Sequence, residues 1–169
     1  MDKIQLSIQY TADDLQRAYL LHLRKTQPFR SRLLFIMGIL LLLMGGILVT
    51  LQFFSGLHSL VPWFFVIYGI ITIAYYQWKI KILGKSAYKK LDDFHHPFEF
   101  TISDESIQVK GKQTSSDIKW DSFIMHVSST EMILLYPNKM RFIALVKKYF
   151  SEEEFEQLCK WVKENVNQK

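Results

Sequence analysis

Two aspartates and two histidines form the most ligand-like cluster of this 169-residue sequence. Asp92, Asp93, His95 and His96 carry carboxylate and imidazole groups, which are common ligands of zinc. However, adjacent residues of an extended chain point to opposite sides, and no second pair of ligands stands at metal-binding spacing. We therefore expect a solvated elbow at this point, with no metal site and no other cofactor.

Nucleophilic catalysis has even weaker support. His22, His58 and His126 are isolated, and no Ser or Cys stands in a recognisable nucleophile motif. The sequence also lacks a glycine-rich phosphate loop, a His-Glu-x-x-His motif and paired cysteines. Its single cysteine, Cys159, suits a small buried apolar position. We therefore expect no enzyme and assign no catalytic residue.

Two apolar segments without charges dominate the first half of the chain. They cover residues 33–54 and 61–78 and are separated by a short loop, residues 55–60. A membrane-spanning helix needs about 20 mostly apolar residues. The two segments are therefore predicted to form an antiparallel transmembrane hairpin with an external loop. Neither contains an acidic, basic or histidine residue, so the usual marks of a proton relay or ion pathway are missing.

Basic residues flank this hairpin and orient it. Residues 1–93 carry 11 Lys and Arg against 5 Asp, whereas residues 94–169 carry 10 Lys and Arg against 11 Asp and Glu. Positive flanks mark the cytoplasmic side, so both termini are expected in the cytoplasm. We expect the flanking cations to contact anionic lipid headgroups rather than nucleic acid. They are Arg24, Lys25, Arg30, Arg32, Lys79, Lys81, Lys85, Lys89 and Lys90.

Small residues recur within the two spans. Small side chains let membrane helices approach closely, and the short loop requires the two spans to be neighbours. We therefore expect the small residues to pack the hairpin, with a homo-oligomer interface as the alternative. They are Gly38, Gly45, Gly46, Gly69 and Ala74.

The segments on either side of the hairpin are predicted to form one soluble domain. Residues 1–32 hold an alternating strand, Lys3 to Tyr10, and an amphipathic helix from Ala12 to about Thr26. Residues 79–93 continue the second span as a basic juxtamembrane helix. Because an isolated strand needs partners, we expect the first strand to join a sheet formed by residues 94–169.

Residues 94–169 show about six further strands and one final helix. The strands are expected at residues 98–102, 107–109, 117–120, 123–128, 132–136 and 141–146, with a turn at Pro137-Asn138-Lys139. Ser151 and Glu154 form a capping box at the start of the helix. The expected fold is thus an α+β membrane protein, with a small antiparallel β-barrel or sandwich closed by a C-terminal α-helix.

Two further features allow binding. Lys147 and Lys148 precede the final helix, where an anion or a partner could bind, although lysines that balance the glutamates of residues 152–154 are the more ordinary interpretation. Trp120 stands alone in the sheet region and is expected in the core rather than on a ligand platform.

Short motifs in a fixed order carry a resemblance to a known family. They are Ile8-x-Tyr10-Thr11 with two aspartates, the hairpin, Ile107 to Lys110, Ile118-Lys119-Trp120, and Phe150 to Phe155. In this order the chain resembles the YcxB-like family of small bacterial membrane proteins. The resemblance implies a pleckstrin-homology-like cytoplasmic domain and a multi-pass location in the bacterial plasma membrane, without catalytic residues. Family members usually carry Ile-Pro-Lys before the final helix, where this chain has Val146-Lys147-Lys148.

Three functions are consistent with these features. The first is a membrane-anchored, non-catalytic binding or scaffold module for a protein partner that the sequence does not identify. The second is a subunit of an oligomeric membrane pore or transporter, suggested by the glycine-lined spans. The third is an enzyme that uses the membrane as its substrate phase. We expect the first.

Overall fold

The structure is a computed structural model that describes residues 3–56, 59–90, 92–112, 114–138 and 141–166, without the side chains of residues 30, 31, 92 and 93. Within these ranges the chain has four α-helices and seven strands in two antiparallel sheets. It divides into two compact units, Met1–Thr26 with Leu83–Lys169, and Gln27–Ile82. The first is the sheet domain, and the second is the helical hairpin.

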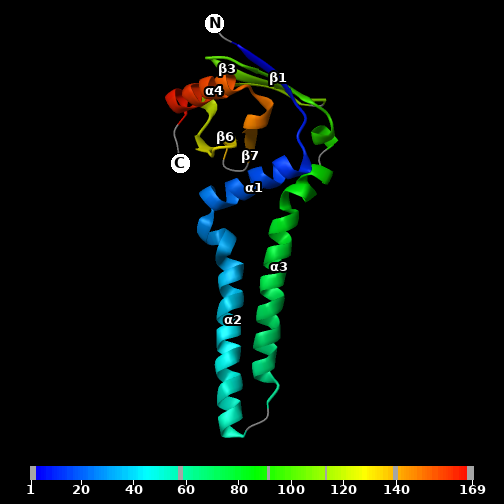
Figure 1. Cartoon of the computed structure of the whole chain (residues 1–169), viewed down its shortest axis with the longest axis vertical. Coiled ribbons are helices and arrows are strands. Elements are labelled where there is room, and N and C mark those ends of the chain that lie inside the picture. Colours follow the sequence, from blue (N-terminus) through cyan, green and yellow to red (C-terminus); the bar gives the residue numbers. More distant parts are fainter. Residues whose placement is uncertain (1–2, 57–58, 91, 113, 139–140, 167–169) are drawn as a thin grey trace. The chain divides into compact units, whose positions relative to one another are not determined.

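The first sheet joins residues from both sides of the hairpin. Its strand order is β1 (Ile4–Ile8), β2 (Phe98–Ile102), β3 (Ser106–Lys110) and β4 (Ser115–Lys119), as Figure 1 shows in part. β1 pairs antiparallel with β2, so that Leu6 lies opposite Phe100. Alternate residues of these strands are buried, as a sheet with one covered face requires. The hairpin is therefore an insertion between two neighbouring strands.

The second sheet has the order β5 (Met125–Ser128), β6 (Met132–Asn138) and β7 (Arg141–Val146). β6 is buried continuously from Met132 to Tyr136, which indicates that both of its faces are covered. The predicted turn Pro137-Asn138-Lys139 begins too early, because β6 continues to Asn138. Its pairing with β7 shifts register after Leu135. Lys139 lies outside the described residues.

Of the two expected architectures, barrel or sandwich, the closed barrel is wrong, because the two antiparallel sheets do not close into one among the described residues. Among the described residues β4 pairs only with β3, and β5 pairs only with β6. A short 3₁₀ turn, η2 (Trp120–Ser122), separates β4 from β5, and its Trp120 indole donates a hydrogen bond to the Ser103 carbonyl at 2.9 Å. This buried side chain thus ties the turn between the two sheets to the loop between β2 and β3. The two sheets nevertheless contribute to one hydrophobic core.

Two α-helices complete the sheet domain. α1 (Ala12–Thr26) begins where the sequence predicts, and α4 (Glu152–Asn165) closes the chain. Both halves of the expected capping box are present: Ser151 Oγ accepts from the Glu154 backbone, and Glu154 accepts from the Ser151 backbone. The buried face of α4 joins the core through the four residues Phe155, Leu158, Trp161 and Val162. Shorter 3₁₀ turns lie at η1 (Asp92–His95) and η3 (Lys147–Tyr149).

The hairpin consists of α2 (Pro28–Ser55) and the longer α3 (Val61–Lys90), which run antiparallel (Figure 1). α3 continues without a break into the predicted basic segment, and its residues from Leu83 onward belong to the sheet domain. Both helices are long and apolar enough to cross a membrane. Only 11% of the most apolar window of each is buried, whereas the core helix of a soluble protein would be mostly buried.

Candidate binding site

The histidine cluster lacks the geometry of a metal centre in the part that is described. The His95 ring packs edge-on against Tyr88 with centroids 4.6 Å apart, and His96 Nε2 lies 3.0 Å from Lys112 Nζ. Among the described residues, no three His, Cys, Asp or Glu side chains lie close enough to hold a metal ion. The side chains of Asp92 and Asp93 lie outside the described residues, so the expectation of a solvated elbow stays a prediction.

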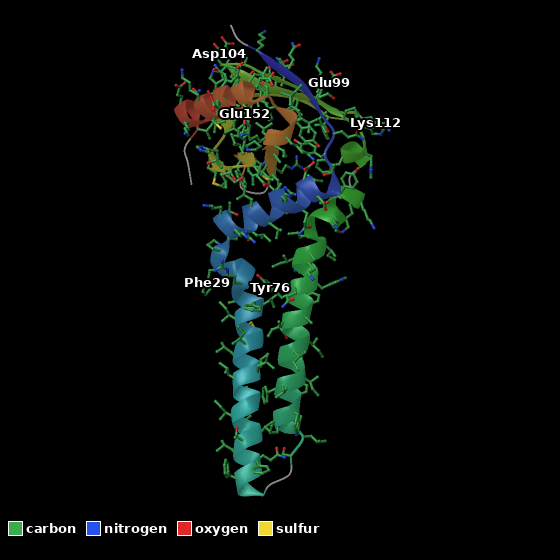
Figure 2. All side chains as sticks on the ribbon, in the orientation of Figure 1. Phe29, Tyr76, Glu99, Asp104, Lys112 and Glu152 are labelled. Carbon is green, nitrogen blue, oxygen red and sulfur yellow. The ribbon has the colours of Figure 1, made fainter. Side chains whose placement is uncertain are left out.

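The two lysines before α4 are already paired. Lys147 Nζ lies 3.6 Å from Glu152 Oε1, and Figure 2 shows Glu152 at the start of α4. Lys148 Nζ lies 2.8 Å from Asp14 Oδ1. An anion bound here would compete with two carboxylates and with the capping side chain of Ser151. The structure thus supports the interpretation that these lysines balance nearby carboxylates. A stronger candidate for a binding site lies elsewhere in the sheet domain.

The partner of Lys148 is a buried carboxylate. Asp14 is only 5% exposed, and its Oδ2 accepts hydrogen bonds from the Thr11 backbone at 3.0 Å and from the Tyr149 hydroxyl at 2.9 Å. Burial by itself would raise the pKa of Asp14, but the bonds from Lys148, Thr11 and Tyr149 outweigh it and lower that pKa. The sequence identifies Asp14 as a helix-start residue, but its partners on η3 are too distant in sequence to predict. This network joins elements and leaves no room for a ligand.

The predicted headgroup contacts are exposed wherever the structure describes them. Arg24 and Lys25 end α1, Arg32 lies early in α2, and the five lysines predicted on α3 all point to solvent. Lys85 makes a weak ion pair with Asp13 at 3.6 Å, where both side chains are more than half exposed. The side chain of Arg30 lies outside the described residues. These cations are therefore free of strong internal pairs in the described structure.

Three of the predicted small residues lie where α2 meets α3. A Cβ atom on Gly38 would approach Ile73 Cγ1 to 2.6 Å, one on Gly45 would approach the Val66 backbone nitrogen to 2.9 Å, and Gly69 is similarly crowded. By contrast, Gly46 has no neighbour within 4 Å of such an atom, and Ala74 is exposed. The close contact between the spans thus uses Gly38, Gly45 and Gly69 rather than all five residues.

A partly open cavity of about 480 Å³ lies in the sheet domain and is called the aromatic cavity below. Its walls come from the end of β1, from α1, η1, β2, β3 and β7. Small-molecule sites occupy about 300–1,000 Å³ and are lined mostly by apolar and aromatic groups. The lining residues are Tyr10, Leu15, Tyr19, Phe94, Phe98, Phe100, Val109, Thr114, Arg141, Phe142, Ile143 and Ala144.

Aromatic rings form much of this wall and fix one another. The rings of Tyr10, Phe94 and Phe98 lie with each pair of centroids 5.8 Å apart. On the opposite side, Tyr19 packs edge-on against Phe142 at 5.2 Å. Edge-to-face pairs of this kind are stabilising beyond their buried area. The cavity therefore has an ordered wall rather than a loosely packed one.

The polar groups on the lining of this cavity include the Tyr10 hydroxyl and the Arg141 side chain. The buried Tyr10 hydroxyl donates to the Ala144 carbonyl at 2.6 Å, and burial raises the pKa of this phenol, so it stays neutral. Arg141 begins β7 and is exposed. Its backbone N–H donates to Asn138 Oδ1 at 2.9 Å, which fixes the start of the strand. The cavity thus has an apolar interior with one cation on its lining.

A second hollow, of about 420 Å³, is more polar and more open. It is lined by residues 96, 97, 99 and 110–112, and Figure 2 shows two of these, Glu99 and Lys112, on the outer side of the sheet domain. Its Lys112 ammonium already lies 3.0 Å from His96 Nε2, and Glu99 and Lys110 stand opposite each other on the paired strands β2 and β3. We therefore regard the aromatic cavity as the candidate binding site.

The sequence did not indicate this cavity. Phe98, Phe100 and Val109 are recognisable as inward-facing strand residues, but alternation cannot tell a filled core from a hollow one. No protein-family model matches the chain, and comparisons with curated proteins and with solved structures found no significant match. The site is therefore assigned from its own geometry.

Proposed function

We propose that the chain is a membrane-anchored, non-catalytic binding module whose ligand site is the aromatic cavity. The observation that carries this proposal is the aromatic-lined hollow of about 480 Å³ in the sheet domain. The two helices of membrane-spanning length are inserted between β1 and β2, so the domain is covalently attached to the hairpin at both ends. Such an attachment tethers the domain to the membrane that the hairpin would enter.

The anchoring part of the proposal places the hairpin in a bacterial plasma membrane with both termini in the cytoplasm. The exposed cations that flank the helices support this orientation. The bacterial plasma-membrane location is proposed from the resemblance to YcxB-like proteins, which rests on short sequence motifs alone. Contact of those cations with anionic headgroups belongs to the same proposal.

Cysteine labelling of intact cells tests the orientation. In a Cys159→Ser background, Ser59→Cys in the loop should react with an impermeant maleimide, whereas Ser115→Cys on β4 should react only after the cells are opened. Both positions are exposed, so reactivity reports the side of the membrane rather than burial. Labelling of Ser115→Cys in intact cells would contradict a cytoplasmic domain.

Photocrosslinking from the cavity tests the binding function. A benzophenone amino acid at Thr114, which lines the cavity, should give a specific adduct in native membranes. The matched control places the same group at Lys119, an exposed residue of β4 outside the cavity. The adduct is identified by mass spectrometry, as a lipid, a small molecule or a protein. Equal products from both positions, or none from either, would contradict a ligand site in the cavity.

A subunit of an oligomeric pore or transporter is the second candidate. The observation in its favour is the long exposed apolar surface of α2, which includes Leu40, Leu43 and Ile47. Such a surface suits lipid equally well, because the small residues that contact α3 are used within the hairpin. Mass measurement in nanodiscs distinguishes these possibilities, since a chain that is always monomeric cannot form an oligomeric pore.

A further inference from the structure

We propose that the aromatic cavity takes the hydrocarbon tail of an anionic single-chain amphiphile drawn from the bilayer, such as a long-chain fatty acid, and that Arg141 binds its head group. This inference rests on the proposed binding function and names the ligand class. Three features of the cavity carry it: an apolar interior, a cation on its lining without an ion-pair partner among the described residues, and a strand edge with a carbonyl that is already used.

The interior suits a hydrocarbon chain. Phe98, Phe100 and Val109 present apolar groups from β2 and β3, and Leu15 does so from α1. Burial of each methylene group of such a chain is favourable. The buried Tyr10 hydroxyl in the wall already donates its hydrogen bond to the Ala144 carbonyl. It therefore needs no hydrogen-bond acceptor on the ligand. A flexible, unbranched tail can follow such a wall without leaving a polar group unpaired.

The head group is specified by Arg141. Among the described residues no carboxylate lies within ion-pair distance of its guanidinium, whereas Arg17, Lys147 and Lys148 all have such partners. A guanidinium presents paired donors that match a carboxylate or phosphate. Because Arg141 is exposed and lines the cavity, it can meet the head of an amphiphile whose tail lies inside.

The same cavity does not favour an extended peptide. A peptide that added a strand here would need the outer edge of β7, where Ala144 offers its carbonyl. That carbonyl already accepts the hydrogen bond of the buried Tyr10 hydroxyl. Strand addition would therefore have to displace a buried ring, whereas a hydrocarbon tail needs no backbone hydrogen bond.

Photolabelling of the full chain in phosphatidylcholine nanodiscs tests this assignment. The probe is a palmitate analogue with a diazirine near the end of its tail, and adducts are mapped by mass spectrometry. We expect adducts on the cavity wall, at residues such as Phe98, Phe100 and Val109, in addition to the adducts that the hairpin acquires from the bilayer. The hairpin adducts serve as the internal standard for probe concentration.

Variants and a second probe distinguish the contribution of the ligand's hydrocarbon tail from that of its head group. Arg141→Gln should reduce the cavity adducts about tenfold, since one charge-assisted interaction is lost, and Arg141→Lys should retain part of them. Thr114→Trp should block the cavity, and the charge-matched control Lys119→Gln should change nothing. The corresponding fatty alcohol should label the wall about tenfold less than the acid does. Equal labelling by acid and alcohol, or no effect of Arg141→Gln, would overturn the anionic specificity.

Different results would contradict the proposed ligand class and the proposed binding function. If palmitate never labels the wall but the benzophenone at Thr114 captures a protein or a neutral molecule, the ligand class is wrong and the binding function stands. If neither probe gives a cavity-specific adduct, the binding function fails as well.

Discussion

Lys148 Nζ lies 2.8 Å from Asp14 Oδ1, which joins the first turn of α1 to the 3₁₀ turn that precedes α4. The Tyr149 hydroxyl lies 2.9 Å from the other carboxylate oxygen. Because Asp14 is buried, removal of its charge takes away the counter-ion of Lys148, and an amide in its place leaves one acceptor oxygen for the donors of Lys148, Thr11 and Tyr149. This network therefore holds the part of the chain before the hairpin against the part after it.

Asp14→Asn should lower the free energy of unfolding by about 2 kcal/mol. This is less than the 3–5 kcal/mol typical of a broken buried pair, because the Lys148 side chain is 48% exposed. Chemical denaturation of the protein in detergent measures the change. Asp13→Asn is the matched control, since Asp13 is exposed, and its effect should stay within about 0.5 kcal/mol. Equal effects of the two variants would remove Asp14 from this role.

The contribution of Asp14 should depend on pH in a defined direction. Its pKa is lowered in the folded protein, so the contribution is complete above the ordinary carboxyl pKa of about 3.9 and is lost as the pH falls through the folded value. The difference in unfolding free energy between the wild type and Asp14→Asn should therefore be constant near neutral pH and shrink below about pH 4. A difference that grows on acidification would contradict the lowered pKa.

Gly84→Ala should separate α1 from the end of α3. An added Cβ atom would lie 2.3 Å from both the backbone N and the Cα of Gln16, so the two backbones must move apart. The move also breaks the hydrogen bond from the Gly84 N–H to Gln16 Oε1, which is 2.7 Å long. We expect a loss of about 2–3 kcal/mol and faster hydrogen–deuterium exchange in α1. Arg17→Ala, at an exposed neighbour, should leave exchange in α1 nearly unchanged.

Two adjacent glycines offer a matched test of hairpin packing. Gly45→Ala should destabilise the contact between α2 and α3 by about 1–2 kcal/mol, because its new methyl group would crowd the Val66 backbone. Gly46→Ala should be neutral or slightly stabilising, since its new methyl group meets no described atom within 4 Å and alanine favours helix. Unfolding in mixed micelles with rising SDS content gives both values. The same loss in both variants would mean that close approach at Gly45 is unimportant.

Ser151→Ala should destabilise the sheet domain by about 1 kcal/mol, because α4 loses the cap on its Glu154 backbone nitrogen. Thermal unfolding followed by circular dichroism measures this change. Glu153→Ala, an exposed neighbour outside the capping box, is the control and should have a smaller effect. A neutral Ser151→Ala would show that core contacts such as that of Leu158 determine the stability of α4 by themselves.

Local sequence patterns predicted most elements of this protein. Apolar patterns located α1 and, with shifted ends, the seven strands: β4 begins at Ser115, Trp120 lies in η2 rather than in a strand, and β5 begins at Met125. The capping box located the start of α4. Uninterrupted apolar composition located both hairpin helices, and glycine positions indicated a face on which they meet. These features are readable because each depends on residues that are neighbours along the chain.

Only the tertiary structure decided how these elements combine. The indole of Trp120 binds the Ser103 carbonyl, and the described strands form two separate sheets rather than a closed barrel, one of the two expected architectures. Lys148 pairs with Asp14 rather than remaining free for an anion, and the rings of Tyr10 and Phe98 border a cavity instead of filling it. Each outcome depends on contacts between residues far apart in sequence. The pattern of a strand or helix specifies which face is buried, but the residue met at that face is determined by packing in three dimensions.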